Sequence, residues 1–216
     1  MSSNRPRILI ADGHIFVADL CKKLLEAEFD VIGTVSNGRA MVRAAVELKP
    51  DLIVVNTAMP VLNGLDAGQQ VKDILPVVKL VFLTMSSDID LAAEAFRRGA
   101  SGYLLLKTCT ASEMLRAVHE VLRGKSYMSQ TLCREEVNYL RLKRKKLPNE
   151  GERLTERQRE VLQLLAEGKA MKEVGDILNM TTRTVAFHKY RMMDRLSARS
   201  NADLVHYAIR NHIVAE

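Results

Sequence analysis

Polar side chains that could do chemistry follow the short apolar runs in the first half of the sequence. Asp12, Asn56 and Thr84 each come at the end of such a run, and Lys107 ends a fifth one. Because parallel strands bring their carboxyl ends to one edge of a sheet, we expect these side chains to gather there. These four side chains include neither a nucleophile paired with a general base nor a set of metal ligands. We therefore predict no enzymatic activity. Asn56 is the unusual member, because an amide is neither a nucleophile nor a general base.

The elements that must position these residues are apolar runs that alternate with amphipathic stretches up to about residue 126. The runs are typical of buried strands, and the stretches between them have helical spacing. Five such repeats predict an α/β domain at residues 1–126, a five-stranded doubly wound parallel sheet with helices on both faces. The expected strands lie within residues 7–11, 30–35, 51–56, 79–85 and 102–107.

The pattern changes after this domain. Residues 127–150 are assigned to a linker, because they contain the basic tract RLKRKK and Pro148. Residues 151–216 show four helical patterns and no strand pattern, which predicts a small all-α domain of four helices. Residues suited to cap these helices are Thr155 with Gln158, Thr181, and Ser200 with Asp203.

Composition and charge exclude several classes of protein. The chain has 216 residues and no apolar run near the ~20 residues that a spanning helix needs, and its start lacks a signal-peptide core. Three scattered cysteines argue against a disulfide framework or a zinc site, so we expect a cytoplasmic protein without metal or cofactor. The net charge of +6 lies entirely in residues 141–216, with 16 basic and 10 acidic residues, and this excess suits a polyanionic partner.

The third helical pattern of the basic domain has two different faces. Val185, Met192 and Leu196 form the face that is expected to pack on the first two helices. The opposite face and its flanks carry aromatic and arginine side chains, and large exposed apolar groups usually mark a partner surface. The major groove of double-stranded DNA would fit the charge, and the alternative occupant is the linker or a neighbouring subunit.

The stretch LTERQREVLQLLAEGKAMKEVGDILNMTTRTVAFHKYRMMDRL, at residues 154–196, resembles the LuxR-type helix-turn-helix. The resemblance implies that Thr181 to Leu196 is a recognition helix in the major groove and that the fourth helix forms a dimer contact. Ala170 and Gly175 depart from the usual Ser and Ala of the family, and each change is expected to destabilise the domain by about 1 kcal/mol. The expected DNA-binding residues are Lys172, Thr181, Thr182, Arg183, Ala186, Phe187, Lys189, Tyr190 and Arg191, and the expected dimerisation residues are Leu204, Tyr207 and Ala208.

Within that set, the residue types suggest different partners on the DNA. Ala186 and Phe187 are suited to thymine methyl groups, and Arg183 is long enough for a guanine edge. Lys172, Lys189 and Arg191 are suited to phosphates, which position the helix without reading sequence, and so belong to the same expected DNA-binding set.

The stretches ILIADGH, PDLIVVNTAMPVLNG, LVFLTMS and GYLLLK resemble the CheY-like receiver domain of NarL/FixJ-type response regulators. In that family a histidine kinase phosphorylates an aspartate at the end of the third strand, and Mg²⁺ is held by this aspartate and two acids after the first strand. The resemblance places Asn56 at the phospho-acceptor position and Asp12 with Gly13 at the acidic pair. Two of the three expected carboxylates are therefore missing.

The other two receiver positions differ from each other. Thr84 matches the hydroxyl residue that responds to the phosphoryl group. The string GYLLLK has one leucine more than the usual GYLLK, so Leu106 takes the lysine position unless a bulge restores Lys107.

Together these features predict a DNA-binding transcription regulator, expected as a homodimer, that acts without aspartyl phosphorylation and for which a histidine kinase is a doubtful partner. A conventional response regulator with an engineered aspartate-to-asparagine change at position 56 is one alternative, although it would not explain Gly13 or the extra leucine. Two others are a protein that titrates a related regulator without binding DNA, and a sensor of a small ligand in the vacated pocket.

Overall fold

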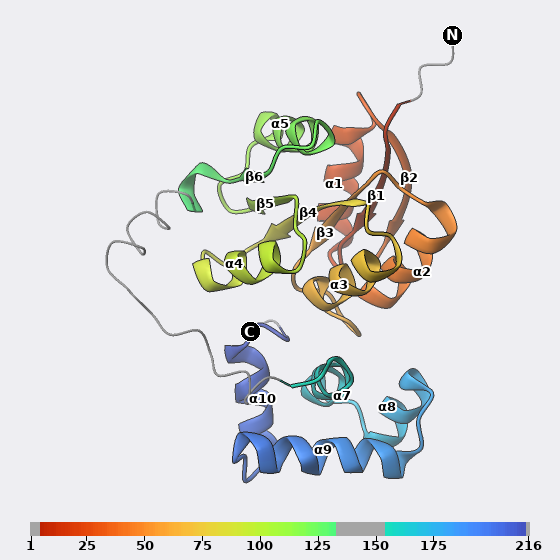
Figure 1. The fold of residues 1–216 in the computed structure, drawn as a ribbon, viewed down its shortest axis with the longest axis vertical. Coiled ribbons are helices and arrows are strands. Elements are labelled where there is room, and N and C mark those ends of the chain that lie inside the picture. The colour runs from red at the N-terminus through yellow and green to blue at the C-terminus, as the bar shows by residue number, and fades with distance from the viewer. Residues whose placement is uncertain (1–4, 133–153, 215–216) are drawn as a thin grey trace. The chain divides into compact units, whose positions relative to one another are not determined.

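Six strands form one parallel sheet in the computed structural model, in the order β2-β1-β3-β4-β5-β6 (Figure 1). The structure describes residues 5–132 and 154–214, which belong to two units, and the sheet lies in the N-terminal one. The strand order reverses between β1 and β3, where open α/β sheets place their sites. The strands are β1 (Arg7–Ala11), β2 (Asp30–Val35), β3 (Leu52–Asn56), β4 (Lys79–Thr84), β5 (Gly102–Leu105) and β6 (Tyr127–Met128).

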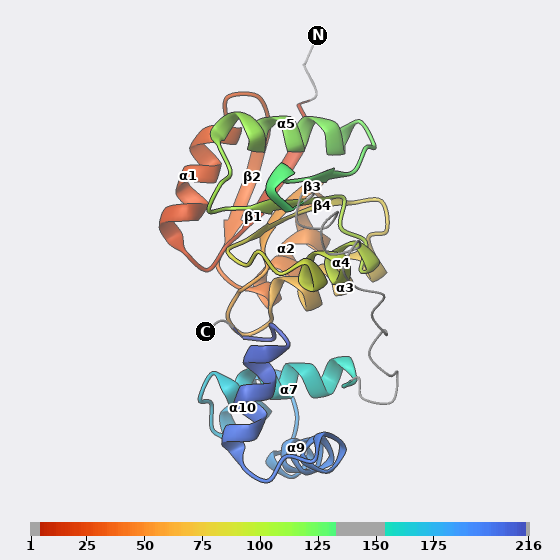
Figure 2. The ribbon, with the colours of Figure 1, turned by 90° about the vertical axis from the view of Figure 1, so that its left-hand side faces the viewer.

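Helices cover both faces of the sheet, which confirms the doubly wound prediction. α1 and α5 lie side by side on one face, and α2, α3 and α4 lie on the other (Figure 2). Every residue of β3 is buried, because this central strand is covered on both sides, and that explains its continuous apolar sequence. The helices are α1 (Ile15–Leu25), α2 (Gly38–Leu48), α3 (Gly64–Ile74), α4 (Ile89–Arg97) and α5 (Ala111–Leu122).

The sixth strand corrects the prediction of five. Tyr127–Met128 pairs in parallel with Gly102–Tyr103 of β5. Ser129 extends this edge, because its hydroxyl accepts a hydrogen bond from the main-chain N–H of Leu105 at 3.1 Å. A strand of two residues has no periodicity, so the sequence pattern does not reveal it. The strand lies within the stretch 127–150 that was assigned to a linker, and residues 133–150 of that stretch lie outside the described residues.

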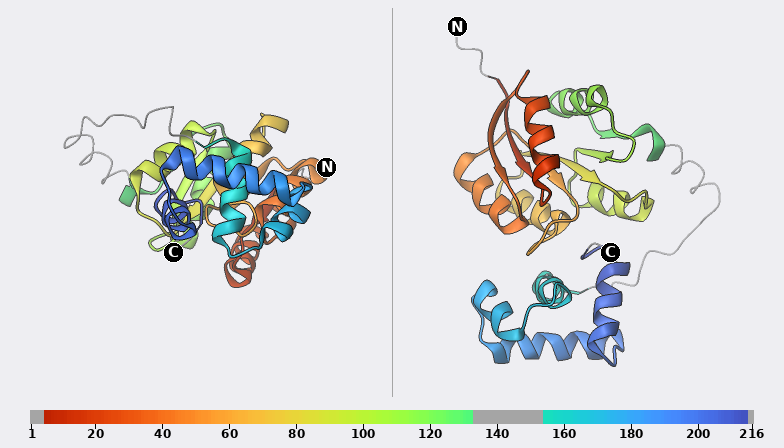
Figure 3. Two further views of the ribbon diagram at one scale, coloured as in Figure 1. Left: turned by 90° about the horizontal axis from the view of Figure 1, so that it is seen from below. Right: turned by 180° about the vertical axis from the view of Figure 1, so that it is seen from behind.

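Residues 154–214 contain four helices, as predicted, packed around a separate apolar core. Figure 3 shows α9 as the longest of them, with the other three on one side of it. α7 and α8 pack against α9, and α10 packs against α7. In the described parts of both units, no helix is long and apolar enough to cross a membrane. The helices are α7 (Glu156–Ala166), α8 (Met171–Leu178), α9 (Thr182–Leu196) and α10 (Asn201–Arg210).

The predicted helix caps are confirmed. The hydroxyl of Thr155 accepts from the N–H of Gln158 at 3.2 Å, and the Gln158 side chain accepts from the N–H of Thr155 at 3.0 Å. Ser200 and Asp203 form the same reciprocal pair at 3.2 and 2.9 Å. Thr181 accepts from the N–H of Thr184 at 3.1 Å and so starts α9. Local sequence therefore fixes where these helices begin.

The two departures in α8 are accommodated by its surroundings. Ala170 has no capping side chain, but its N–H donates to the carboxylate of Glu173 at 2.7 Å. A Cβ atom at residue 175 would lie 2.6 Å from the main-chain oxygen of Met180, in the turn that leads to α9. The turn therefore approaches α8 too closely for a side chain, and this explains the glycine that helix propensity alone would disfavour.

We therefore expect Gly175→Ala to destabilise the helical domain by about 1–2 kcal/mol, since the new methyl group meets a main-chain atom that moves only with the turn. Urea unfolding of the full-length chain, followed by circular dichroism, measures the difference. Helix propensity alone predicts the opposite sign, a stabilisation of about 1 kcal/mol. Observation of that stabilisation would show that the turn yields freely.

Candidate functional site

Asp12 and Asn56 meet at the carboxyl edge of the sheet, as expected. β1 and β3 pair in parallel, with Ala11 opposite Val55. The residues that follow this pair, Asp12 and Asn56, therefore lie side by side. The Asn56 Nδ2 atom donates to both carboxylate oxygens of Asp12, at 3.1 and 3.0 Å. Both side chains are buried. The amide thus supplies the donor that a buried carboxylate requires.

The remaining polar atoms of this pair are also engaged. The Asn56 Oδ1 atom accepts from the N–H of Ala58 at 2.9 Å. The Asp12 Oδ1 atom accepts from the N–H of His14 at 2.8 Å and lies 3.1 Å from its Nδ1. Gly13 stands between these residues in a bend and offers no side chain. The site is therefore a closed hydrogen-bonded cluster around one carboxylate.

Thr84, at the end of β4, has a partner that the sequence did not suggest. The hydroxyl of Thr57 lies 3.2 Å from that of Thr84, and the N–H of Ser86 donates to Thr84 at 3.1 Å. No motif in the sequence indicates Thr57. Its place directly after Asn56, at the end of β3, is the one signal that could have pointed to it. The Tyr103 side chain is fully buried on β5, and its burial raises the pKa of the hydroxyl to about 12.

Lys107 is exposed and is not part of this cluster. β4 and β5 pair in register from Val81–Gly102 to Thr84–Leu105, and the N–H of Leu106 donates to the main-chain oxygen of Thr84 at 2.8 Å. Lys107 follows in a turn and is exposed. Because the register is unbroken, the extra leucine displaces the lysine by one residue, and the expectation that Lys107 gathers at this edge is corrected.

The donor set does not fit Mg²⁺, the metal that the receiver resemblance implies. Magnesium prefers octahedral oxygen ligands and several carboxylates, whereas Asp12 supplies one carboxylate and the Asn56 Nδ2 atom points a donor at it. Among residues 5–132 and 154–214, no group of three or more His, Cys, Asp or Glu side chains could hold a metal ion.

Burial raises the pKa of Cys21 to about 12 and that of Cys109 to about 11, so neither thiol is activated.

The second candidate site is the outward face of α9. Val185 and Met192 are buried in the domain core, and Phe187 and Tyr190 on the other side are 55% and 59% exposed. The Arg191 guanidinium carbon lies 5.4 Å from the centroid of the Phe187 ring. The Lys189 Nζ atom lies 5.8 Å from the centroid of the Tyr190 ring. The helix thus presents aromatic rings with a cation on each, an arrangement suited to a polyanion that also offers apolar groups.

The other residues of the predicted interface lie around this face. Thr181 caps α9, Ala186 is half-buried, and the exposed members are Lys172, Thr182 and Arg183. One positioning residue was not foreseen: Arg157 on α7 donates to the main-chain oxygen of Leu178, at the end of α8. This hydrogen bond connects α7 to the end of α8, where the turn that leads to α9 begins. Burial and the charge of Arg157 lower the pKa of His188 on the inner flank of α9.

Two of the three predicted dimerisation residues lie inside their own domain. Leu204 and Ala208 are 3% and 0% exposed, because they fill the core of their own domain against α7. Tyr207 is half-buried. The helical spacing that makes these residues one face of α10 was correct, but that face is used within the chain.

Comparison with known proteins identifies both halves. Residues 8–119 match the response regulator receiver domain, and residues 152–208 match the luxR family of bacterial regulatory proteins. The chain is 35% identical over 211 residues to the transcriptional regulatory protein LiaR of Bacillus subtilis, covering 96% of this chain and 99% of LiaR. It is 29% identical over 215 residues to the oxygen regulatory protein NreC of Staphylococcus aureus, covering 96% and 99%. The chain therefore belongs to the response regulators with a receiver domain and a LuxR-type helix-turn-helix domain.

Solved structures share the fold. RcsB of Salmonella typhimurium superposes with a TM-score of 0.63 at 21% identity, covering 94% of this chain and 96% of that chain. A LuxR-family response regulator from Aurantimonas sp. gives a TM-score of 0.60 at 25% identity, covering 64% and 99%. The likeness to RcsB extends over nearly the whole chain, whereas the likeness to the Aurantimonas protein covers 64% of it.

Proposed function

We propose that this chain is a DNA-binding transcription regulator whose receiver-like domain acts without aspartyl phosphorylation. The exposed cationic and aromatic face of α9 carries the first part of the proposal, because it fits the groove and the charge of duplex DNA. The family agrees with it: LiaR is named a transcriptional regulatory protein, and RcsB has been solved as dimers bound to DNA.

The cluster around Asn56 supports the second part. An acyl phosphate forms when an anionic carboxylate attacks phosphorus, and the amide of Asn56 has no such oxygen. Its Nδ2 atom also occupies both oxygens of Asp12, the one carboxylate that could recruit magnesium there. A histidine kinase has no acceptor at this position, so we propose that the signal reaches the protein by another route.

The homodimer is proposed through a surface other than α10. Ile15, Phe16 and Leu20 of α1 are 76%, 80% and 57% exposed, and such a cluster usually marks a partner surface. The same helix carries one acidic residue, Asp19, and two basic ones, Lys22 and Lys23, so two copies related by a two-fold axis can pair unlike charges. Two copies would place their α9 helices in major grooves about 34 Å apart.

Binding of the untreated full-length protein to DNA tests the first part. A site selected from a random-sequence pool should be retained in a gel shift, with an affinity that falls steeply as salt rises. We expect a footprint that spans two half-sites one helical turn apart. Absence of salt-sensitive retention would favour the alternative of a protein that only titrates a related regulator.

Treatment with acetyl phosphate and Mg²⁺ tests the second part. We expect no acid-stable, alkali-labile phosphoryl group and no change in DNA affinity, because the acceptor carboxylate is missing. Intact-protein mass spectrometry measures the modification directly. Stoichiometric phosphorylation with an accompanying rise in affinity would contradict the proposal.

A further inference from the structure

The exposed ring of Phe187 contacts two neighbours on α9. The Arg191 guanidinium carbon lies over it, 5.4 Å from the ring centroid, and the His188 ring meets it edge-on with the ring centroids 5.8 Å apart. Arg191 lies one helical turn beyond Phe187, so both side chains project from the same side of the helix. An apolar ring that stays 55% exposed while fixed in this way is preorganised for contact with a ligand.

The chemistry of the major groove narrows what this pair can recognise. The thymine C5-methyl group projects into the major groove as a partner for apolar side chains, and guanine O6 and N7 form the acceptor pair that arginine binds bidentately. The planar guanidinium keeps its hydrogen-bonding edge available while its face rests on an aromatic ring. Phe187 and Arg191 therefore match a thymine and a guanine, whereas a phosphate would leave the ring without a partner.

We infer that Phe187 and Arg191 act as one unit that reads a thymine methyl group and a nearby guanine in the major groove. This inference rests on the proposed DNA-binding function and gives Arg191 a base to read in place of the phosphate suggested by its residue type.

The second aromatic pair provides a matched control. The Lys189 Nζ atom lies over the Tyr190 ring at 5.8 Å, and Tyr190 is as exposed as Phe187. Lysine carries a compact charge without the planar fork of arginine, so this pair suits a phosphate and positions the helix. Loss of Tyr190 should therefore weaken binding without altering the preference for thymine.

Uracil-substituted DNA isolates the methyl contact, because it removes the C5-methyl group and leaves base pairing and all hydrogen-bonding groups unchanged. With full-length protein and a site selected from random sequences, each critical thymine replaced by uracil should weaken binding about fourfold per half-site, the value of one buried methyl group. Phe187→Ala should bind both DNAs equally, and Phe187→Leu should keep part of the preference. Tyr190→Ala should bind more weakly but keep the full fourfold ratio.

A second base analogue tests the guanine contact. Replacing the nearby guanine with 7-deazaguanine removes the N7 acceptor and should weaken native binding about fivefold, and Arg191→Ala should abolish that difference. All these side chains are exposed, so the substitutions leave the core intact. Equal affinity for thymine and uracil DNA, or a thymine preference that survives in Phe187→Ala, would overturn the readout while leaving DNA binding in place. Failure to select any DNA would overturn both the readout and the proposed function.

Discussion

Replacing Asn56 by aspartate is expected to lower the free energy of unfolding of the receiver-like domain by about 3 kcal/mol at neutral pH without divalent metal. In the native chain the amide donates to both oxygens of Asp12, at 3.1 and 3.0 Å, and both groups are buried. The substitution removes these hydrogen bonds and places a second negative charge at the same distance. Repulsion and burial then both oppose ionisation of the pair.

The loss should depend on pH in a defined direction. In the folded Asn56→Asp variant one carboxyl of the pair has a raised pKa, because two adjacent carboxylates cannot both ionise easily. A raised folded-state pKa contributes stability at low pH that is lost as pH rises through it. The difference from the native protein should therefore narrow as pH falls from about 8 to about 5, and urea unfolding at both values measures it.

Two controls make the Asn56 result specific. Asn37 caps α2 by accepting from the N–H of Ala40 at 2.9 Å, and aspartate caps helices equally well, so Asn37→Asp should change stability by less than about 0.5 kcal/mol. Excess Mg²⁺ should restore part of the stability in Asn56→Asp only, because that variant alone offers two adjacent carboxylates. An Asn56→Asp variant as stable as the native protein at high pH with a chelator present would contradict this account.

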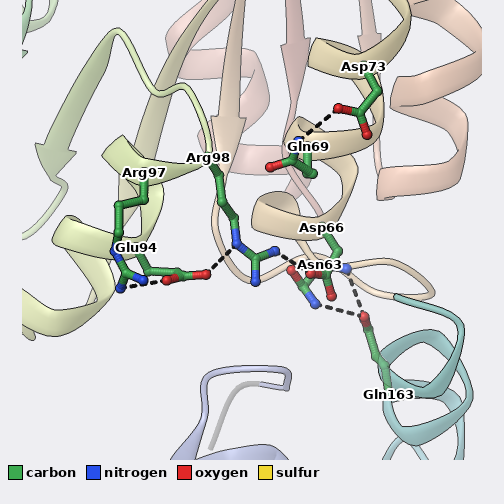
Figure 4. A network of polar contacts seen from close by, with 8 residues as sticks. All are labelled: Asn63, Asp66, Gln69, Asp73, Glu94, Arg97, Arg98 and Gln163. Carbon is green, nitrogen blue, oxygen red and sulfur yellow. Dashed lines mark hydrogen bonds and ion pairs between the residues drawn. The ribbon is translucent and has the colours of Figure 1, made fainter. Parts of the chain in front are cut away.

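Arg98→Ala is expected to destabilise the same domain by about 3–4 kcal/mol, because Arg98 joins α3 and α4 through charges that are largely buried. Its Nη1 atom lies 2.6 Å from Asp66, and its Nε atom lies 2.6 Å from Glu94 (Figure 4). Burial alone would lower the pKa of Arg98, but Asp66 and Glu94 raise it above the usual value. Truncation removes the cation that lies 2.6 Å from the buried carboxylate of Asp66.

Arg97 offers the matched control for this network. It lies 2.6 Å from the other oxygen of Glu94, but its side chain is 45% exposed. Arg97→Ala should therefore cost less than about 1 kcal/mol. In the Arg98→Ala background, Asp66→Asn should recover part of the stability, because it removes the charge left behind. Equal effects of the two arginine substitutions in urea unfolding would show that burial does not strengthen the Arg98 contacts.

Features that depend on neighbours in sequence were predicted well. The caps at Thr155, Thr181 and Ser200 are confirmed, because a capping side chain contacts main-chain atoms only a few residues away. The burial of Val185 and Met192 opposite an exposed Phe187 follows from helical periodicity. The parallel sheet with helices on both faces was predicted from alternation alone, whereas β6 was missed because two residues carry no period.

Features that depend on distant contacts were not predicted. Leu204 and Ala208 share a face of α10, but only the packing of the domain decides that this face is internal. The sequence predicted that Gly175 destabilises the domain. In the fold a glycine is required there, because a Cβ atom at residue 175 would lie 2.6 Å from the main-chain oxygen of Met180. Neither fact leaves a signal in the local sequence, since each arises when separate elements pack together.

The sequence by itself determined that position 56 holds an amide, that position 13 lacks a carboxylate, and that the basic excess lies at residues 141–216. These are chemical identities, and no fold can change them. Only the tertiary structure decided that the Asn56 amide donates to both oxygens of Asp12, and that Lys107 lies exposed beyond an unbroken strand register. It also placed Arg191 over Phe187. These outcomes depend on how side chains meet in space, and residue types and spacing constrain that only weakly.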